Sequence, residues 1–391
     1  MPLRVLIGGV AYGQGNVGDE AILEGILRDL EQVRGEIEVS VLTWRPQSTA
    51  ERLGVRGIKV TTTSPLRAVL DADLVICGGA SIFAPYWPQK EPLGILKGYP
   101  LYPSVFTLWA RLLGKPTMIY AAGVEPLSLR WMQRVVAFAC RCASVVTVRD
   151  PASATLLEEW GAPRGKALAA ADPAFSLRPA SNSGLAEDFM RRQGIASSSR
   201  PLVGLSLAYE PEAIKRPQQL AAFFAQAADY IAEELQATPV FIPMNTTPEF
   251  DHWVMSEAIR TMRRPEEARL LSGDYAPSEL LAFLAHVDLV ISTRMHLLIL
   301  AMVAGTPFLA VSRGPKIDSL VERTGAEVFA RTDELDFPAL AGRLRSAWAR
   351  RDELRAAQAA GLASLRAAGE ANRRLILGLV RGRIGEAHGR R

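Results

Sequence analysis

The chain has 391 residues, of which 49% are hydrophobic and 22% charged, as is typical of a globular protein with a large buried core. Its length exceeds what a single hydrophobic core usually supports, so we expect two domains. The formal net charge of +4 is too small to indicate nucleic-acid binding, and it suits an acidic substrate or contact with an anionic membrane surface.

Short apolar runs alternate with helical patterns in the first half of the chain. Strands are predicted at residues 5–7, 38–42, 74–77, 117–121 and 144–148, and helices at residues 19–34, 104–113, 128–142 and 151–160. Strands separated by helices indicate right-handed βαβ units and a parallel sheet. We therefore predict a Rossmann-like N-terminal domain over residues 1–178. Residues 179–200 are rich in Ser, Asn and Gly, which is typical of a linker.

The same alternation returns in the second half. Strands are predicted at residues 202–206, 239–242, 269–271, 288–291 and 308–311, and helices at residues 217–236, 249–264, 277–285 and 296–304. The pattern predicts a second Rossmann-like domain over residues 201–345. Residues 346–391 are rich in Ala, Arg and Leu and are predicted to form a long C-terminal helix with a basic tail. The expected fold class is α/β, with two doubly wound domains facing a cleft.

The three cysteines do not suggest a disulfide framework. Cys77 lies in an apolar run, whereas Cys140 and Cys142 are two residues apart in a helical pattern. This usage is typical of a reduced, cytoplasmic protein. The four histidines are scattered, so we expect no metal site. We find neither a signal-peptide pattern nor an apolar run of the ~18 residues that a membrane-spanning helix needs, and we expect a cytoplasmic protein.

A glycine-rich turn follows the first predicted strand. Gly13, Gly15 and Gly18 match the spacing of the dinucleotide-binding fingerprint. The next strand, however, ends in Thr43-Trp44-Arg45 instead of an acid for the ribose, which argues against NAD and leaves only a weak case for NADP. The chain has no P-loop sequence, which excludes that class of nucleotide-binding protein.

Two further glycine turns follow strands, at residues 78–81 and 123–126. The three turns lie at the carboxyl ends of parallel strands and would line one edge of the first sheet, where backbone can approach a ligand closely. Ordinary turn chemistry is the alternative explanation for any one of them, but the three together favour a binding surface. Asp19 and Glu20 open the following helix, where acids also favour the helix dipole.

The most informative segment is residues 292–301, followed by Gly305-Thr306-Pro307. An apolar strand ends at Ser292, and Arg294 and His296 come directly before an apolar helix. The strand-to-helix turn of an α/β sheet is where such sheets bind ligands, and a helix N-terminus suits an anion. We therefore predict an acidic ligand beside a histidine that can move a proton. The alternative is a structural arginine paired with Asp288 or Asp318.

An ordered set of motifs then indicates a family. The chain resembles the polysaccharide pyruvyl transferases, and among them the bacterial enzymes that modify a cell-wall polysaccharide anchoring surface-layer proteins. The motifs lie at residues 13–23, 77–83, 122–127, 148–153, 171–175, 241–244, 294–296 and 314–316.

The resemblance implies a GT-B-like fold, phosphoenolpyruvate as the donor and a lipid-linked or polymeric hexosamine as the acceptor. The product would be a pyruvate ketal, with no cofactor and no nucleic-acid partner, made in the cytoplasm at the inner face of the membrane. The donor would contact Arg294 and His296, which are also the expected catalytic pair, and Lys316 and Arg149. The acceptor side would involve residues of the glycine turns and two acids, namely Asn16, Gly18, Asp19, Gly78, Gly79 and Asp172.

The chain departs from the family pattern in the second half. Arg294-Met295-His296-Leu297 stands where the family usually has Arg-Leu-His-Ala, and residues 312–316 lack the aspartate of the family's Tyr-Asp-Pro-Lys sequence. Two other interpretations therefore stay open. One is a GT-B glycosyltransferase or sugar-nucleotide epimerase that uses a UDP-sugar, and the other is a non-catalytic carbohydrate-binding relative.

Overall fold

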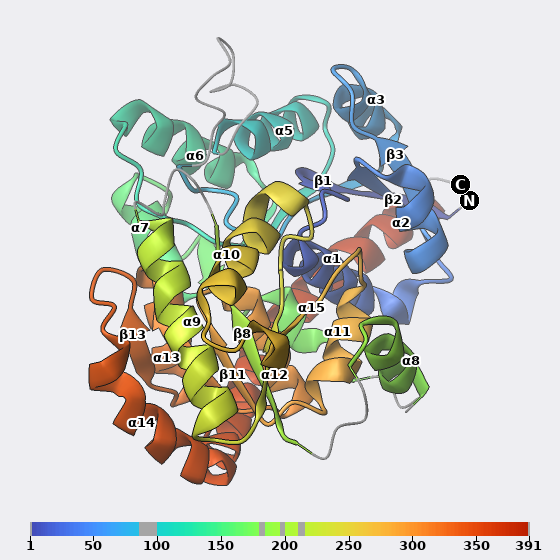
Figure 1. Ribbon diagram of the computed structural model, residues 1–391. Helices are drawn as coiled ribbons and strands as arrows, with labels where there is room; N and C mark the ends of the chain where they lie inside the picture. Colours follow the sequence, from blue (N-terminus) through green and yellow to red (C-terminus); the bar gives the residue numbers. More distant parts are fainter. Residues whose placement is uncertain (1, 86–99, 180–183, 196–199, 210–215, 390–391) are drawn as a thin grey trace. The chain divides into compact units, whose positions relative to one another are not determined.

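The computed structural model describes residues 2–85, 100–179, 184–195, 200–209 and 216–389 (Figure 1). The chain forms two compact units. The first contains Met1–Gln14, Asp19–Leu177 and Arg366–Arg391, and the second contains Gly15–Gly18 and Arg178–Leu365. Residues 180–183 and 196–199 of the predicted linker lie outside the described residues.

A seven-stranded parallel sheet forms the centre of the first unit. Its strands run in the order β3-β2-β1-β4-β5-β6-β7, so the chain starts in the middle and the order reverses between β1 and β4. The strands are β1 (Leu3–Tyr12), β2 (Ile37–Thr43), β3 (Arg56–Lys59), β4 (Leu74–Gly78), β5 (Thr117–Ala122), β6 (Val145–Val148) and β7 (Ala167–Ala169).

Helices connect these strands and cover the sheet. They are α1 (Val17–Asp29), η1 (Glu31–Val33), α2 (Pro46–Leu53), α3 (Ser64–Asp71), α5 (Leu101–Leu112), α6 (Arg130–Cys142), α7 (Pro151–Glu159) and η2 (Pro173–Ser176). The apolar strands β4 and β5 are buried along their whole length, as expected of parallel strands that helices cover on both faces.

The second unit contains a six-stranded parallel sheet in the order β10-β9-β8-β11-β12-β13, which reverses between β8 and β11. The strands are β8 (Leu202–Ser206), β9 (Thr238–Phe241), β10 (Arg269–Leu270), β11 (Leu289–Ser292), β12 (Phe308–Ser312) and β13 (Val328–Arg331). The helices are α8 (Gly184–Arg192), α9 (Pro217–Glu233), η3 (Pro248–His252), α10 (Trp253–Thr261), η4 (Pro265–Glu267), α11 (Pro277–Leu284), α12 (Met295–Ala304), α13 (Pro315–Thr324) and α14 (Phe337–Ala349). Figure 1 shows α9 and α10 side by side.

The prediction of two doubly wound α/β domains with a long C-terminal helix is confirmed. The predicted strands are present, and three strands that the sequence did not predict, β3, β7 and β13, all lie at sheet edges. Edge strands need no continuous apolar run, and β3 indeed reads Arg-Gly-Ile-Lys. Helices α2, α3, α13 and α14 were also missed.

The C-terminal helix α15 (Arg351–Gly389) has 39 residues and continues through most of the predicted basic tail. Its first part belongs to the second unit, where the Gln358 side-chain amide bonds both backbone groups of Phe308 at 3.0 and 2.9 Å. Its last part belongs to the first unit, where Ile376 and Val380 join the apolar core. None of the helices within the described residues is long and apolar enough to cross a membrane.

A buried carboxylate at the end of α1 predicts a pH-dependent stability. Burial raises the pKa of Asp29 to about 6, although hydrogen bonds from Tyr120 and Ser176 oppose the rise. In the unfolded chain the Asp29 carboxyl group ionises near its ordinary pKa of 3.8. Between this pH and about pH 6, the folded state therefore keeps a proton that the unfolded state has lost. The stability of the wild type relative to Asp29→Asn should therefore fall by about 3 kcal/mol between about pH 4 and 6 and stay level above. Urea unfolding of both proteins across this range checks it, and a pH-independent difference would contradict it.

Candidate functional site

The turn after β11 is fixed to the neighbouring strand β8. The Thr293 N–H donates to the Ser206 carbonyl oxygen at 2.9 Å, and the Thr293 hydroxyl accepts from the Ala208 N–H at 2.7 Å. Ser292 Oγ accepts the Arg294 N–H at 2.8 Å. Arg294 occupies the N-cap position of α12, and His296 is the second residue of that helix. Both residues therefore lie at a strand-to-helix turn, as predicted, and the structure adds that the strand order of the second sheet reverses there.

Arg294 is held by Asp251, which the sequence did not suggest as its partner. Arg294 Nε donates to Asp251 Oδ2 at 2.9 Å, and Nη2 donates to Oδ1. The expectation that a structural partner would be Asp288 or Asp318 is wrong for this pair. Asp288 accepts the Leu202 N–H, and Asp318 pairs with Arg331.

Asp251 is completely buried and accepts three more hydrogen bonds, all from backbone N–H groups. Oδ1 accepts from Tyr209 at 3.0 Å, and Oδ2 accepts from Met244 at 3.1 Å and from Asn245 at 3.0 Å. Tyr209 follows β8, Met244 and Asn245 follow β9, and Arg294 follows β11. The Asp251 carboxylate thus forms hydrogen bonds to the segments that follow three neighbouring strands. A fully buried charge requires such complete pairing.

The glycine turn after β1 packs against the segment that follows β9. Residues Gly15–Gly18 of this turn belong to the second unit. The Val17 N–H donates to the Met244 carbonyl oxygen at 2.8 Å, and the Thr246 N–H donates to the Gly15 carbonyl oxygen at 2.9 Å. Asn16 pairs with Asn245 in an antiparallel bridge. The turn is thereby fixed to the same loop that bonds Asp251.

Gly18 lies directly against the His296 ring. Its N–H donates to Asn16 Oδ1 at 3.0 Å. A Cβ atom on Gly18 would stand 2.4 Å from His296 Nδ1 and 2.7 Å from Cγ. The close approach requires glycine because any side chain would overlap the imidazole. The Nδ1 edge of the ring therefore faces the glycine backbone.

Gly18→Ala should displace the imidazole of His296 without harming the rest of the fold. The added methyl group overlaps the ring, whereas the Gly18 backbone has no positive φ to strain. The variant should shift the His296 imidazole resonance in the NMR spectrum and leave the thermal midpoint within a few degrees. Gly35→Ala serves as the control, since a Cβ on Gly35 meets nothing within 4 Å. An unchanged His296 resonance would contradict the contact.

Further basic side chains follow β12, the neighbour of β11. Arg313 and Lys316 are half-buried, and Lys316 lies in the first turn of α13. The turn is fixed by Ser312 Oγ, which donates to Asp318 Oδ1 at 2.6 Å and accepts the Gly314 N–H at 3.2 Å. The N-termini of α12 and α13 thus follow adjacent parallel strands, and they bring basic groups to one edge of the sheet.

The remaining predicted acceptor residues belong to the first unit. Gly78 and Gly79 allow the end of β4 to approach α1, since a Cβ on Gly79 would lie 2.0 Å from Ile22 Cγ2. Asp172 is buried and accepts the Ala174 N–H at 3.0 Å at the start of η2. Asp19 lies in the first turn of α1. These structural roles are sufficient to explain the residue found at each position. A role of these residues in binding the acceptor stays a prediction.

Arg149 is buried in the first unit beside two carboxylates. Its Nε lies 3.4 Å from Asp150 Oδ2 and its Nη2 lies 4.0 Å from Glu125 Oε1. A Cβ on Gly123 would stand 2.5 Å from Arg149 Cζ, so the guanidinium covers this glycine. The arrangement supports the turn after β5. Among the predicted site residues, the structure groups Asn16, Gly18, Arg294, His296 and Lys316 in one unit, and Arg149 in the other.

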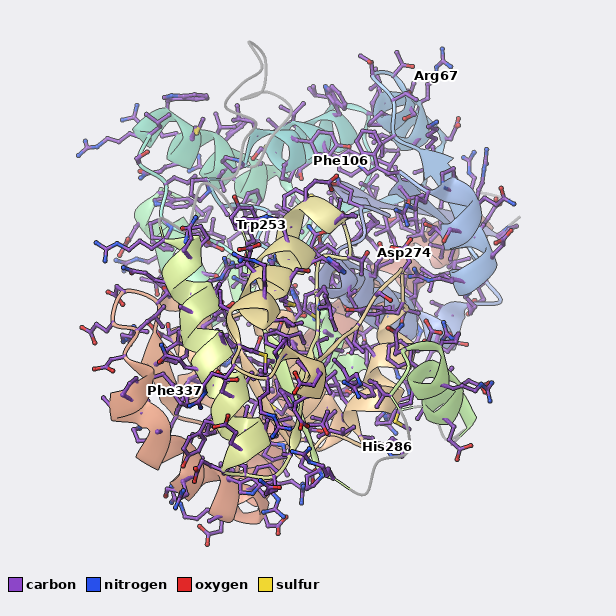
Figure 2. All side chains as sticks on the ribbon, viewed as in Figure 1. Arg67, Phe106, Trp253, Asp274, His286 and Phe337 are labelled. Atoms are coloured by element: carbon purple, nitrogen blue, oxygen red, sulfur yellow. The ribbon has the colours of Figure 1, made fainter. Side chains whose placement is uncertain are left out.

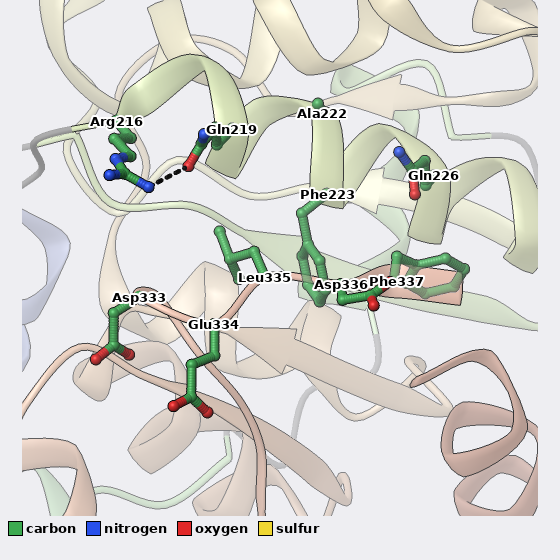
Figure 3. Close-up of a pocket in the computed structure, with 10 residues that line it drawn as sticks. All are labelled: Arg216, Gln219, Ala222, Phe223, Gln226, Asp333, Glu334, Leu335, Asp336 and Phe337. Carbon is green, nitrogen blue, oxygen red and sulfur yellow. Dashed lines mark hydrogen bonds between the residues drawn. The ribbon is translucent and has the colours of Figure 1, made fainter. Parts of the chain in front are cut away.

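A cavity of about 520 Å³ lies elsewhere in the second unit, between the first half of α9 and the segment before α14 (Figure 3). It is lined by Arg216, Gln219, Ala222, Phe223, Gln226, Asp333, Glu334, Leu335, Asp336 and Phe337. Three carboxylates outnumber the single guanidinium, so this cavity does not suit a multiply charged anion.

Comparison with known proteins supports the fold and the family. The family model "Polysaccharide pyruvyl transferase" matches residues 16–315, which is more than half of the chain and includes Asp251, Arg294 and His296. No curated protein matches the chain.

Solved structures with the same fold have low sequence identity. Anabaena Alr3699/HepE in complex with UDP and glucose is 14% identical, with a TM-score of 0.62 over 97% of this chain and 100% of that chain. A putative UDP-N-acetylglucosamine 2-epimerase from Listeria monocytogenes is 14% identical, with a TM-score of 0.65 over 97% and 96%. S. aureus MnaA with UDP is 13% identical, with a TM-score of 0.63 over 92% and 91%. These likenesses establish the fold, and the family match establishes that the chain belongs to the polysaccharide pyruvyl transferases.

Proposed function

We propose that the protein transfers a pyruvyl group from phosphoenolpyruvate to a hexosamine of a cell-wall polysaccharide, or of its lipid-linked precursor, and releases phosphate. The observation that carries the proposal is the placement of Arg294 and His296 at the reversal point of the second sheet, inside the family match. A lipid-linked acceptor would place the reaction at the inner face of the membrane, and surface-layer anchoring is the proposed purpose of the product.

The charges at the ends of β11 and β12 support an anionic donor. Phosphoenolpyruvate carries a carboxylate and a phosphate, and two helix N-termini together with Arg294, Arg313 and Lys316 lie at this edge. Asp251 neutralises the charge of Arg294 and occupies its Nε–Nη2 edge. We therefore assign Arg294 chiefly to orientation of the donor, and Lys316 and Arg313 to attraction of its charge.

The proposed reaction begins with a proton transfer. His296 gives a proton to the methylene carbon of phosphoenolpyruvate, which becomes a methyl group and leaves an oxocarbenium-like centre at C2. An acceptor hydroxyl attacks C2 and loses its proton. The C2–O bond to phosphate then breaks, phosphate leaves with the electron pair, and a second hydroxyl closes the ketal. One hydroxyl proton restores His296 and the other leaves with phosphate, so the protons balance.

Histidine suits this role because its ordinary pKa lies near neutral pH. With the Nδ1 edge of His296 facing Gly18, Nε2 is the nitrogen we assign to proton transfer. The acceptor side is proposed to involve Asn16 and Gly18 beside His296, and Asp19, Gly78, Gly79 and Asp172 from the first unit. Arg149 is proposed as a further donor contact.

Calorimetric titration tests the donor. Phosphoenolpyruvate, UDP-N-acetylmannosamine, UDP-N-acetylglucosamine and NADH are each titrated into the wild type and into Arg294→Lys, which keeps the charge beside Asp251 but loses the planar pairing. We expect only phosphoenolpyruvate to bind, more weakly in the variant. Binding of a UDP-sugar instead would make the protein a UDP-sugar enzyme, like the UDP-bound structures of the same fold. Phosphate release that requires a hexosamine acceptor would exclude a non-catalytic carbohydrate-binding protein.

A further inference from the structure

We propose that Asp251 is the positioning residue of this site and that it sets the orientation of both Arg294 and His296. This inference deepens the proposed function, on which its binding readout rests. Asp251 lies 43 residues before Arg294, at the irregular turn η3 between β9 and α10. It acts by two routes, one direct and one through the glycine turn.

The direct route is the ion pair. Asp251 holds the Nε–Nη2 edge of Arg294, which fixes the plane of the guanidinium. The Arg294 side chain keeps 13% of its surface exposed, whereas that of Asp251 is completely buried, so the carboxylate supports the guanidinium from the interior side. A guanidinium held in one plane has a fixed orientation, which favours bidentate contact with a carboxylate or phosphate.

The second route reaches His296 through backbone. Asp251 bonds the N–H groups of Met244 and Asn245. The Met244 carbonyl oxygen accepts from Val17, and Val17 is followed by Gly18, which lies against the imidazole. The carboxylate therefore supports both Arg294, two positions before His296, and the Gly18 backbone that packs against the Nδ1 edge of the imidazole. Movement of the loop after β9 would change the space available to the imidazole.

The site specifically requires an ionised carboxylate. Five N–H groups converge on its two oxygen atoms, and a carboxylate has only acceptors. The amide of asparagine would keep one acceptor oxygen and turn an NH₂ group toward donors. Asp251→Asn therefore preserves the volume but disturbs at least two of these hydrogen bonds.

Asp229 offers a matched control in the same unit. It lies on α9, is 5% exposed, and accepts the Arg263 N–H at 3.0 and 3.2 Å, with Arg263 Nε at 3.5 Å. Asp229→Asn thus removes a buried carboxylate that is paired with arginine and backbone, but away from the strand ends. Any effect of Asp251→Asn that Asp229→Asn reproduces belongs to stability alone.

The experiment compares both variants by histidine NMR and by phosphoenolpyruvate titration. The chain has four histidines, so ¹³C-labelled imidazole spectra are simple, and His296→Ala assigns the resonance. The exposed His286 is the internal reference (Figure 2). We expect Asp251→Asn to shift the His296 resonance, leave that of His286 unchanged, and weaken phosphoenolpyruvate binding by about tenfold, as for a lost bond to a charged group. Asp229→Asn should do neither.

A second variant tests the backbone route without touching a buried charge. The Thr246 hydroxyl lies 3.1 Å from the Gly15 carbonyl oxygen and 2.8 Å from Asp274 Oδ1. Thr246→Val should loosen the glycine turn and shift the His296 resonance while the Asp251–Arg294 pair stays intact. An unchanged His296 resonance in both Asp251→Asn and Thr246→Val would overturn the proposal. The wild type could bind no phosphoenolpyruvate while Asp251→Asn, unlike Asp229→Asn, shifts the His296 resonance. In that case the positioning role stands and the proposed donor is wrong.

Discussion

Substitution of His296 by alanine is expected to lower acceptor-dependent phosphate release by about 10²–10⁴-fold, the usual contribution of a positioned acid–base group. The half-buried imidazole lies at the start of α12, and alanine has no group that can deliver a proton. The protein should stay folded, because alanine is the residue most compatible with a helix. The assay measures phosphate released from phosphoenolpyruvate with hexosamine-containing cell-wall saccharides as acceptors.

The control for this result is His286→Ala. His286 is exposed in the turn between α11 and β11, so its loss should leave phosphate release unchanged (Figure 2). Equal activity in His296→Ala and the wild type would remove His296 from the mechanism. Equal losses in the two variants would point to a general effect on the domain.

Arg294→Ala is expected to destabilise the second unit by about 3–5 kcal/mol, the cost of breaking a buried ion pair from one side. The variant leaves Asp251 fully buried with only three backbone donors. The comparison is Arg263→Ala. The Arg263 side chain is 68% exposed beside Asp229, so its removal should cost less than about 1 kcal/mol. Denaturant unfolding that follows the two units separately provides the measurement.

This expectation changes how loss of binding in Arg294→Ala must be interpreted. A protein that is partly unfolded binds no ligand, whatever role the guanidinium has. Arg294→Lys is the informative substitution, because it keeps a cation beside Asp251. Equal stability of Arg294→Ala and the wild type would show that the Asp251 carboxylate needs no arginine partner.

The central strands were predictable because burial leaves a simple pattern in the sequence. The runs that became β4, β8 and β11 are continuously apolar, as parallel strands covered on both faces must be. The edge strand β3, Arg-Gly-Ile-Lys, carries no such pattern. Helix α13 was missed because it directly follows the turn at Arg313 and Gly314 and has only three buried apolar side chains, Ile317, Leu320 and Val321.

The pair Arg294 and His296 was predictable because both residues lie within one local motif. Asp251 was not, since its partners lie after three different strands and only the sheet order brings them together. An acid between Phe250 and His252 in an irregular turn gives no local signal. The contact of Gly18 with His296 was hidden for the same reason, because 278 positions of chain separate the two residues. Long-range pairing of this kind follows from tertiary structure alone.

The path of the chain has a consequence for its synthesis. The first unit takes Ile376, Leu377 and Val380 of α15 into its apolar core, although most of that unit is complete by Leu177. On the ribosome, the second unit emerges before α15 can complete the apolar core around the N-terminal sheet. We therefore expect a nascent chain that ends before residue 366 to keep an exposed apolar surface and to depend on chaperones until α15 has been synthesised.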